Sequence, residues 1–220
     1  VNFLREQCGM HQDNVYLVNG PVNLSRIQAV HSLVERSDLK FKPFTQGRPT
    51  GMTGDVDLFA SIKKNEFLLH HPYESFGPII DLIKQAAADN SVLAIKQTLY
   101  RTGASSPIVD ALVAAAHAGK EVTVVVELRA RFDEEANVAL AAKLQEAGAH
   151  VVYGIVGYKT HAKMLLILRR ENNKLRRYVH LGTGNYHRST SRIYTDYGLL
   201  TSDRQLGEDV NNLFIQLTSL

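Results

Sequence analysis

The residues with the clearest chemical potential are His161-Ala162-Lys163, which a short apolar run at residues 164–168 follows. Residues two apart on a strand project from the same face. If residues 160–168 are extended, we expect His161 and Lys163 to point side by side. A nucleophile or base then lies beside a fixed cation, an arrangement that suits phosphate chemistry. The alternative interpretation of so short a pattern is a surface His and Lys on an exposed strand.

A second element suited to phosphate follows farther along the chain at Gly182-Thr183-Gly184-Asn185. Glycine at 182 and 184 lets the backbone approach an anion closely. The Asn185 amide offers both a donor and an acceptor. It could orient a phosphate oxygen or the imidazole, or it could cap the turn, and both alternatives stay open. The two elements together favour a phosphate site over an ordinary surface pair.

The composition is that of a globular protein without a strong charge bias. The 220 residues are 45% hydrophobic and 21% charged, with a formal net charge of +3. The single cysteine, Cys8, excludes an internal disulfide and a cysteine-based zinc site, and it fits a reducing compartment. The sequence has neither a long apolar run nor a signal-like start, so we expect a cytoplasmic location without a spanning helix.

The organisation along the chain predicts two parts. Residues 1–53 hold a predicted strand at 15–18 and a helical pattern at Ile27, Val30, Leu33 and Val34, followed by a Gly- and Pro-rich linker. We interpret them as the tail of a preceding domain, with the main domain at residues 54–220. Because the chain starts at Val1 and stops just after a predicted helix, we expect it to be a piece of something longer.

The sequence pattern of the main domain predicts an α/β fold. Strands and helices alternate, which favours right-handed crossovers, a mostly parallel sheet and helices on both faces. Two apolar runs around the polar turn at Asn172-Asn173 predict an added antiparallel hairpin. The predicted helices are residues 74–89, 106–117, 133–147 and 208–217, the predicted strands are 92–99, 121–128 and 150–153, and the hairpin arms are 164–168 and 178–181.

Three arginines follow the ends of predicted strands. Arg101 comes after the strand at 92–99, and Arg129 and Arg131 come after the strand at 121–128. Ligands of parallel α/β sheets lie at the carboxyl ends of the strands. We therefore expect guanidinium groups at one rim, where a planar fork of donors can grip phosphate oxygens. The alternative for these arginines is surface salt bridging with Glu127, Asp133 or Glu134.

Several segments, in order, closely resemble the polyphosphate kinase family, the enzymes that extend inorganic polyphosphate from ATP. The resemblance covers residues 55–220. It rests on residues 71–73, 96–101, 125–137, 158–163, 180–186 and 194–197.

This resemblance implies a phospholipase D-like fold and the first of two catalytic domains that share one site. The second domain, with another His-x-Lys element, would lie downstream, so this chain would be a fragment that is inactive alone. The family implies ATP and polyphosphate as substrates, Mg²⁺ as cofactor and no nucleic-acid partner, and it leaves homo-oligomers and peripheral membrane association open. Leu168 stands where the wider superfamily has an Asp after the Lys.

By its place in the motif, His161 matches the residue that the family phosphorylates. The phosphate comes from the terminal position of ATP, and the transfer is reversible. Lys163 would neutralise the moving phosphoryl group, with Asn185 beside it. Arg101 and Arg131 match arginines of the family's magnesium site, where Mg²⁺ would bridge the phosphate oxygens that they hold, since a guanidinium has no acceptor for a metal. Tyr194 matches a tyrosine of the ATP site, although a tyrosine near a sheet edge is often merely packed.

Other residues receive weaker interpretations. Lys96, Lys159 and His180 are candidates to line a polyanion path, and Glu127 and His71 to lie behind the site. Another enzyme class, a phospholipase D-like phosphodiesterase, would also use His-x-Lys and Gly-Thr-Gly-Asn, but the arginines favour a run of phosphates over one diester. A third hypothesis is that the 220 residues alone only fold and bind polyanions.

Overall fold

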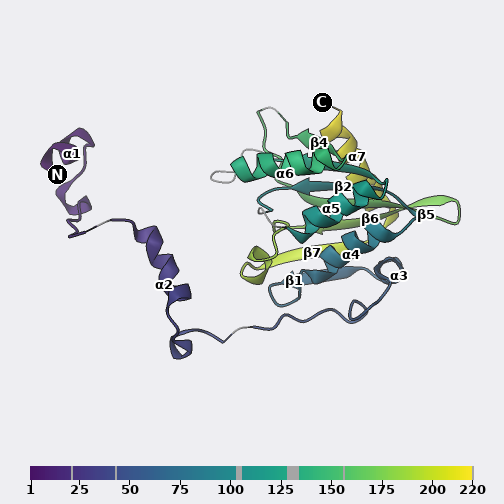
Figure 1. The fold of residues 1–220 in the computed structure, drawn as a ribbon, viewed down its shortest axis with the longest axis horizontal. Coiled ribbons are helices and arrows are strands. Elements are labelled where there is room, and N and C mark those ends of the chain that lie inside the picture. The colour runs from purple at the N-terminus through teal and green to yellow at the C-terminus, as the bar shows by residue number, and fades with distance from the viewer. Residues whose placement is uncertain (21, 43, 103–105, 128–133, 156, 220) are drawn as a thin grey trace. The chain divides into compact units, whose positions relative to one another are not determined.

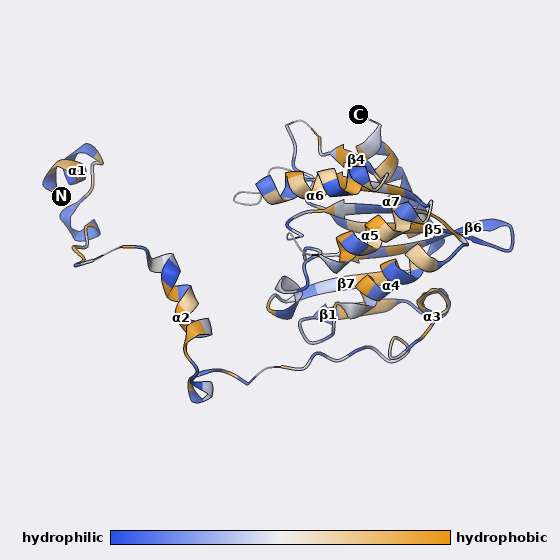
Figure 2. Cartoon of the chain, in the orientation of Figure 1, coloured by the Kyte–Doolittle hydropathy of each residue, from blue (hydrophilic) through white to orange (hydrophobic). Residues whose placement is uncertain are grey.

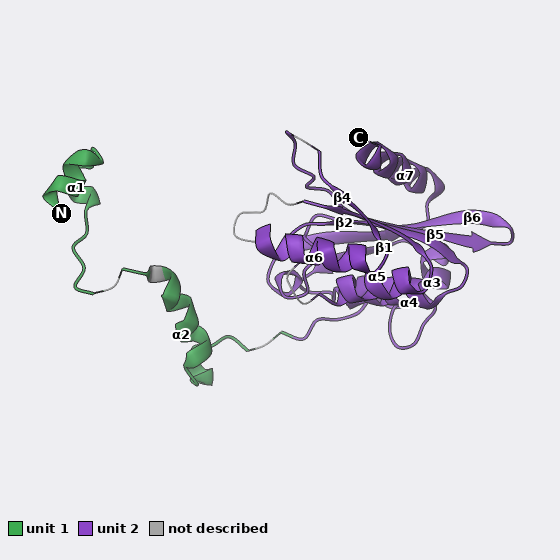
Figure 3. Ribbon diagram, turned by 45° about the horizontal axis from the view of Figure 1, so that its top comes forward, with its two compact units in different colours: residues 1–44 green, residues 45–220 purple. Residues whose placement is uncertain are grey.

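A computed structural model of the protein divides into two compact units, Val1–Phe44 and Thr45–Leu220 (Figure 3). The larger unit holds all the candidate site residues that the structure describes. The described residues are 1–20, 22–42, 44–102, 106–127, 134–155 and 157–219.

Among its described residues the smaller unit contains two short α-helices, three 3-10 helices and no buried side chain. The α-helices are α1 (Asn2–Gln7) and α2 (Gln28–Leu33), and α2 confirms the predicted helical spacing in part. The apolar residues of that pattern are exposed, with Ile27 at 61% and Leu33 at 78%. The predicted strand at residues 15–18 is wrong, because the segment is irregular and has no pairing partner for its backbone.

The larger unit alternates helices and strands along most of its length (Figure 1). Its described helices are α3 (Leu58–Lys64), α4 (Gly77–Ala88), α5 (Pro107–His117), α6 (Glu134–Glu146) and α7 (Arg204–Thr218), and its described strands are β1 (Phe67–His71), β2 (Val92–Leu99), β3 (Glu121–Val126), β4 (His150–Tyr153), β5 (Lys163–Glu171), β6 (Lys174–Gly182) and β7 (Asp196–Thr201).

The strands form one mixed sheet in the order β1-β7-β6-β5-β2-β3-β4. Only β2 with β3 and β3 with β4 pair in parallel among the described strands, whereas the remaining neighbours are antiparallel. The expectation of a mostly parallel sheet is therefore corrected. Crossover helices α5 and α6 enforce parallel pairing only for the strands that they connect, and a hairpin enters the sheet beside β2 in the opposite direction.

That hairpin confirms the prediction made around Asn172-Asn173. Strands β5 and β6 pair antiparallel from Lys163 opposite Gly182 to Glu171 opposite Lys174. Asn172 and Asn173 have φ angles of 48° and 61°, both in the left-handed region. Two such residues make the turn type that matches the twist of the flanking strands. The turn thus sets the register that places Lys163 beside the Gly-Thr-Gly-Asn segment.

Helices cover both faces of the sheet, as the sequence predicts. Leu165 and Ile167 of β5 pack in a large cluster with helices α3 to α6, while Met164 and Leu166 pack on the other face with Phe214 of α7. Hydrophobic residues accordingly run along α4, α5 and the central strands (Figure 2). Because β5 is buried on both faces, Lys163 at its start has a rigid support.

The larger compact unit begins at Thr45, and the domain boundary expected at residue 54 stays a prediction. The Gly47 N–H donates to the Tyr73 carbonyl at 3.0 Å, and the Gly47 carbonyl accepts from the Ser75 N–H at 2.8 Å. Met52 is fully buried. Residues 47–52 of the Gly- and Pro-rich segment therefore pack on the rest of the larger unit.

No described helix is both long enough and apolar enough to cross a membrane.

Candidate active site

His161 and Lys163 lie side by side, as the sequence predicts. The Lys163 Nζ lies 3.0 Å from Nδ1 and 3.1 Å from Nε2 of His161, and it donates to the His161 carbonyl at 2.7 Å. Lys163 is buried at the start of β5, and His161 precedes the strand with its side chain exposed. The pair therefore combines an accessible imidazole with a cation that the sheet holds in place.

The protonation of His161 follows from its neighbours. A lysine ammonium has donors only, so a ring nitrogen accepts from Lys163 only when the imidazole is neutral. Although His161 is exposed, partial desolvation of its ring by neighbouring groups is the largest cause that lowers its pKa. The positive charges of Lys163, Lys159 and Arg101 lower this pKa further. At neutral pH the imidazole is therefore the uncharged nucleophilic form.

A carboxylate faces the same cation from β7. Burial lowers the pKa of Lys163, while the negative charge of Asp196 opposes that shift. Asp196 accepts from the Thr183 hydroxyl at 2.8 Å, and the Tyr197 N–H donates to that hydroxyl at 2.9 Å. The glycine-rich turn after β6 is thereby tied to β7.

Gly184 shows why this turn needs glycine. A Cβ added at Gly184 would overlap the Asp196 side chain. At Gly182, which pairs with Lys163, an added Cβ would lie 3.2 Å from His180 Cε1. The absence of side chains lets the turn pass close to Lys163 and Asp196, as expected for backbone that approaches an anion site.

Glu127 positions the segment that leads to His161. Its side chain is 4% exposed, and its Oε2 accepts from the Thr160 N–H at 2.7 Å. The Glu127 carbonyl accepts from the Asn137 amide at 3.2 Å. Glu127 follows β3 directly, so one carboxylate joins the end of that strand to the residue before His161. The sequence interpretation that Glu127 lies behind the site agrees with this place.

Tyr100 is a neighbour of His161 to which the sequence interpretation gave no role. The two rings meet edge to face with centroids 5.1 Å apart. The Nζ atoms of Lys159 and Lys163 lie 5.0 and 5.6 Å from the Tyr100 centroid, and Cζ of Arg101 lies 5.4 Å away. An aromatic face attracts such cations. The signal in the sequence was the place of Tyr100, directly after β2 and before Arg101.

Five of the predicted site residues meet at one cavity of about 500 Å³. Arg101 enters it after β2 with a left-handed φ of 50°, uncommon for a residue with a side chain. Asp196 and His187 line it without having been assigned a role. The lining residues are Arg101, His161, Lys163, Thr183, Gly184, Asn185, His187, Thr190, Tyr194 and Asp196.

The roles given to these residues stay predictions. Tyr194 is 61% exposed, so its ring is open to a ligand rather than packed. Arg129 and Arg131 lie outside the described residues. That Arg129 and Arg131 share a rim with Arg101 therefore stays a prediction.

His180 does not line a path for a polymer, which corrects that interpretation. It is 1% exposed, and its Nδ1 lies 2.8 Å from the Tyr186 hydroxyl. Burial, followed by the charge of His71, lowers the pKa of His180 to about 3. His180 sits on β6 with Tyr178 and Val179, which are also buried. The imidazole is thus a neutral part of the interior behind the cavity.

Comparison with known proteins gives the family. The model of the family described as "Polyphosphate kinase C-terminal domain 1" matches residues 57–220. This chain belongs to the polyphosphate kinase family. Polyphosphate kinase of Xylella fastidiosa (strain 9a5c) is 60% identical over 220 residues, which are 100% of this chain and 31% of that protein. The chain thus spans about a third of the length of the family members that it matches.

Solved structures agree with the fold. The crystal structure of polyphosphate kinase from Porphyromonas gingivalis matches with a TM-score of 0.74 and 32% identity, over 93% of this chain and 34% of that one. Nuc of Salmonella typhimurium, a phospholipase D family member, matches with a TM-score of 0.53 and 18% identity, over 70% of this chain and 93% of that one. The second likeness concerns the fold alone, which is phospholipase D-like.

Proposed function

We propose that the longer polypeptide of which this chain is a part transfers the terminal phosphate of ATP reversibly to inorganic polyphosphate, through a phosphohistidine at His161. The observation that carries the proposal is the contact of the Lys163 ammonium with the His161 ring at 3.0 and 3.1 Å, at the mouth of a cavity lined by cations and a glycine-rich turn. Membership of the polyphosphate kinase family supports the choice of substrates.

The transfer proceeds in two displacements. A neutral ring nitrogen of His161 attacks the γ-phosphorus, an N–P bond forms, the P–O bond to the β-phosphate breaks, and ADP leaves. A terminal oxygen of polyphosphate then attacks the same phosphorus, and the N–P bond breaks to regenerate the imidazole. Either phosphoanhydride can load the histidine, so the reaction runs in both directions.

The cavity supplies charge where the moving phosphoryl group needs it. Lys163 and Arg101 neutralise its oxygens, which is the largest contribution in most phosphoryl transfers. Asn185 orients a phosphate oxygen or caps the turn, and Tyr194 offers its ring to the nucleotide. Arg131 is the second arginine that we propose for the phosphates.

The donors of the cavity fit a magnesium ion that arrives with the nucleotide. No group of three or more His, Cys, Asp or Glu gathers for a metal within the described part of the chain. Mg²⁺ is commonly held by one or two carboxylates together with substrate phosphates. Among the described lining residues Asp196 is the carboxylate that would hold the ion, and Arg101 would hold the phosphate oxygens of the nucleotide. Bound Mg²⁺ would supply further neutralisation of phosphate charge.

The proposal also concerns the part of the polypeptide outside this chain. We propose a second catalytic domain outside this chain, so the isolated 220 residues bind polyanions without sustained turnover. The single exposed Cys8 supports a cytoplasmic location, where thiols stay reduced.

Labelling with γ-labelled ATP tests the proposal in the full-length protein. We expect acid-labile, base-stable label on His161 and none in His161→Ala. His117→Ala serves as the matched control, because His117 is exposed at the end of α5 and outside the cavity.

Undiminished label in His161→Ala would end the proposal. Release of nucleotides or of choline from a diester, without ATP consumption, would support the phosphodiesterase alternative instead. Sustained polyphosphate synthesis by the isolated 220 residues would contradict the need for a second domain.

A further inference from the structure

A second cavity, of about 490 Å³, lies at the turn end of the β5–β6 hairpin. It shares no lining residue with the cavity at His161. Five of its lining residues are cationic and one is acidic. These residues are Lys63, Glu171, Asn172, Lys174, Leu175, Arg176, Arg177, Ser202 and Arg204.

The single carboxylate of this cavity is already engaged. Glu171 accepts from Lys63 at 2.8 Å, from Arg169 at 2.8 Å and from the Tyr178 hydroxyl at 2.6 Å. Arg176 Nε lies 3.3 Å from Glu171 Oε2, the oxygen that also accepts from Lys63, while Arg169 and Tyr178 donate to Oε1. These hydrogen bonds lower the pKa of Glu171 to about 2 against the opposing effect of burial. Glu171 therefore leaves the other cations of the cavity without a balancing charge.

Three cations of the cavity remain without an ion pair among the described residues: Lys174, Arg177 and Arg204. The Nε of Arg177 is also buried without a hydrogen-bond partner there. A buried guanidinium nitrogen rarely stays unpaired, because its desolvation is then uncompensated. An anionic oxygen in the cavity would pair it, and a planar guanidinium matches phosphate well.

Packing between secondary-structure elements shapes this cavity, in addition to its flexible side chains. The stem of Arg177 lies under α7, where a Cβ added at Gly207 would be 2.9 Å from Arg177 Cβ. Glycine at 207 lets the helix pass over the arginine. Lys174 opens β6 and Arg204 opens α7, so a strand and a helix bring their first residues to one opening.

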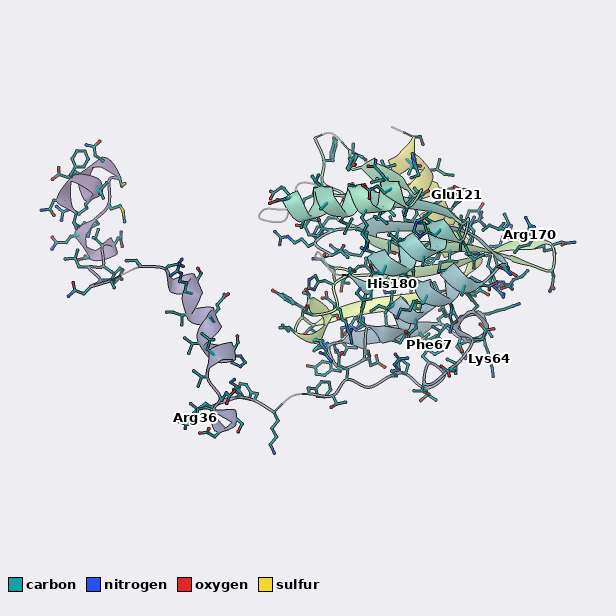
Figure 4. All side chains as sticks on the ribbon, viewed as in Figure 1. Arg36, Lys64, Phe67, Glu121, Arg170 and His180 are labelled. Atoms are coloured by element: carbon teal, nitrogen blue, oxygen red, sulfur yellow. The ribbon has the colours of Figure 1, made fainter. Side chains whose placement is uncertain are left out.

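The cavity is far from His161. Strand β5 has nine residues, so its ends lie roughly 26 Å apart. Arg170 near the hairpin turn and His180 toward the other end mark this separation (Figure 4). A ligand that touched both cavities would have to be a long polyanion.

We propose that the hairpin-end cavity binds inner phosphates of an inorganic polyphosphate chain, as a second contact remote from His161. The inference rests on the proposed function for the choice of polyanion. Among the described residues its lining contains no aromatic side chain, whereas sites for single-stranded nucleic acid stack bases on aromatic rings. A run of phosphates without bases matches a lining of cations alone. The second contact would hold the polymer between successive transfers.

The test uses the full-length protein that carries this chain, with Lys174→Ala/Arg204→Ala as the cavity variant. Both side chains are exposed, so their loss leaves the core intact. Lys64→Ala/Arg170→Ala is the matched control, because it removes one lysine and one arginine that are also exposed but do not line the cavity (Figure 4). The probe is end-labelled long-chain inorganic polyphosphate without ATP, and the readout is fluorescence anisotropy at fixed salt.

We expect the cavity variant to bind the long polymer about tenfold more weakly, and the control to stay within about twofold of the wild type. Equal losses in both variants would reduce the effect to net charge and overturn the inference, as would an unchanged affinity in the cavity variant. Tripolyphosphate should compete poorly, because it is too short to reach both cavities. A duplex DNA competitor that displaces the probe better than long polyphosphate would overturn the inference in favour of nucleic acid.

The labelling of His161 tests the proposed function independently of the binding measurement. Absence of label on His161 would sink the phosphotransfer proposal while the binding measurement still decides the cavity. Normal labelling with unchanged polymer affinity in the cavity variant would leave the phosphotransfer proposal standing and discard the second contact.

Discussion

At the scale of single residues, the reactivity of His161 depends on cations that lie around it. Lys163 contacts the ring, and the charges of Lys159 and Arg101 add to the effect of burial in lowering the pKa of His161. In the proposed mechanism, the same cations that keep the imidazole neutral also attract the phosphates that it would attack. One cluster of charges would then serve both activation of the nucleophile and binding of the substrate.

This cluster predicts a pH dependence of His161 labelling by ATP. The neutral imidazole reacts, so the rate falls as the pH drops through a pKa that is lowered below about 6.5 in the folded protein. In Lys163→Met the loss of a positive charge raises the pKa of His161. The fall of the labelling rate on the acid side of the pH profile, the acid limb, therefore moves to higher pH. The plateau rate falls by about a hundredfold or more, because charge stabilisation of the phosphoryl group is lost.

Lys159→Met is the graded control for this prediction. Lys159 lowers the pKa of His161 less than Lys163 does, so the acid limb should move in the same direction by a smaller amount. Rates of label incorporation between pH 5 and pH 8 provide the measurement. A limb that moves to lower pH in Lys163→Met would contradict the electrostatic account.

His180 predicts a second pH effect, on stability. Its pKa is about 3 in the folded protein and near 6.5 when unfolded, because burial, followed by the charge of His71, disfavours the charged form. Its contribution to stability is present above about pH 6.5 and is lost as the pH falls from there toward 3. Between pH 7 and pH 5 this loss amounts to about 2 kcal/mol.

Urea unfolding of wild type and His180→Gln at pH 7 and pH 5 measures this effect. Glutamine does not titrate, so the variant should be less stable at pH 7 but should lose about 2 kcal/mol less than the wild type between the two pH values. Equal losses in the two proteins would show that other groups cause the acid sensitivity.

At the scale of elements, the β5–β6 hairpin joins the two cavities and both faces of the domain. Lys163 lies at one end of the hairpin and Glu171 at the other, and the residues between them alternate between the two hydrophobic clusters. Helix α7 covers one of these faces through Phe214, which is fully buried. The position of Lys163, which contacts His161, thus depends on packing along the whole hairpin.

Phe214→Ala should therefore destabilise the domain by about 3–5 kcal/mol, since it removes a buried aromatic side chain and leaves a cavity. Ile215→Ala is the control on the same helix, with a side chain that is 50% exposed, and should cost at most about 0.5 kcal/mol. Chemical denaturation of the two variants measures the difference. Similar values for both would mean that α7 does not pack on the sheet as described.

At the scale of the whole molecule, the two units differ in how they are stabilised. Val1–Phe44 has no described buried side chain, whereas the core residues of the described chain belong to Thr45–Leu220. Apolar residues of α2 such as Val30 and Leu33 are exposed, and an isolated helix of this length is marginal in water. The cooperative unit of folding is therefore the larger one.

Removal of residues 1–44 from the 220-residue chain should leave the melting temperature within about 2 °C, because no described side chain of that segment is buried. Differential scanning calorimetry of residues 45–220 beside the 220-residue chain gives the comparison. A control that begins at residue 54 should melt lower, since it loses the buried Met52 and the backbone hydrogen bonds of Gly47. Equal melting of both truncated forms would contradict the domain start at Thr45.

Local patterns predicted the elements whose signals lie within one segment. Strand β2 and helix α5 have the expected bounds, because a compact apolar run and a Pro-start with a Gly-stop are local features. The sequence interpretation missed α3, β1 and β7. Strands β1 and β7 pair with each other antiparallel at the side of the sheet, and that pairing joins segments more than a hundred residues apart in the chain.

By itself, the sequence determined the alternation of helices and strands, the hairpin at Asn172-Asn173, and the motifs that place His161, Lys163 and Asn185 in the polyphosphate kinase family. The tertiary structure alone decided the mixed order of the sheet, the contact of Tyr100 with His161 and the facing of Asp196 toward Lys163. The reason is physical: turns and amphipathic periods are set by neighbouring residues, whereas strand pairing and the charges around a side chain depend on segments that meet only after the chain has folded.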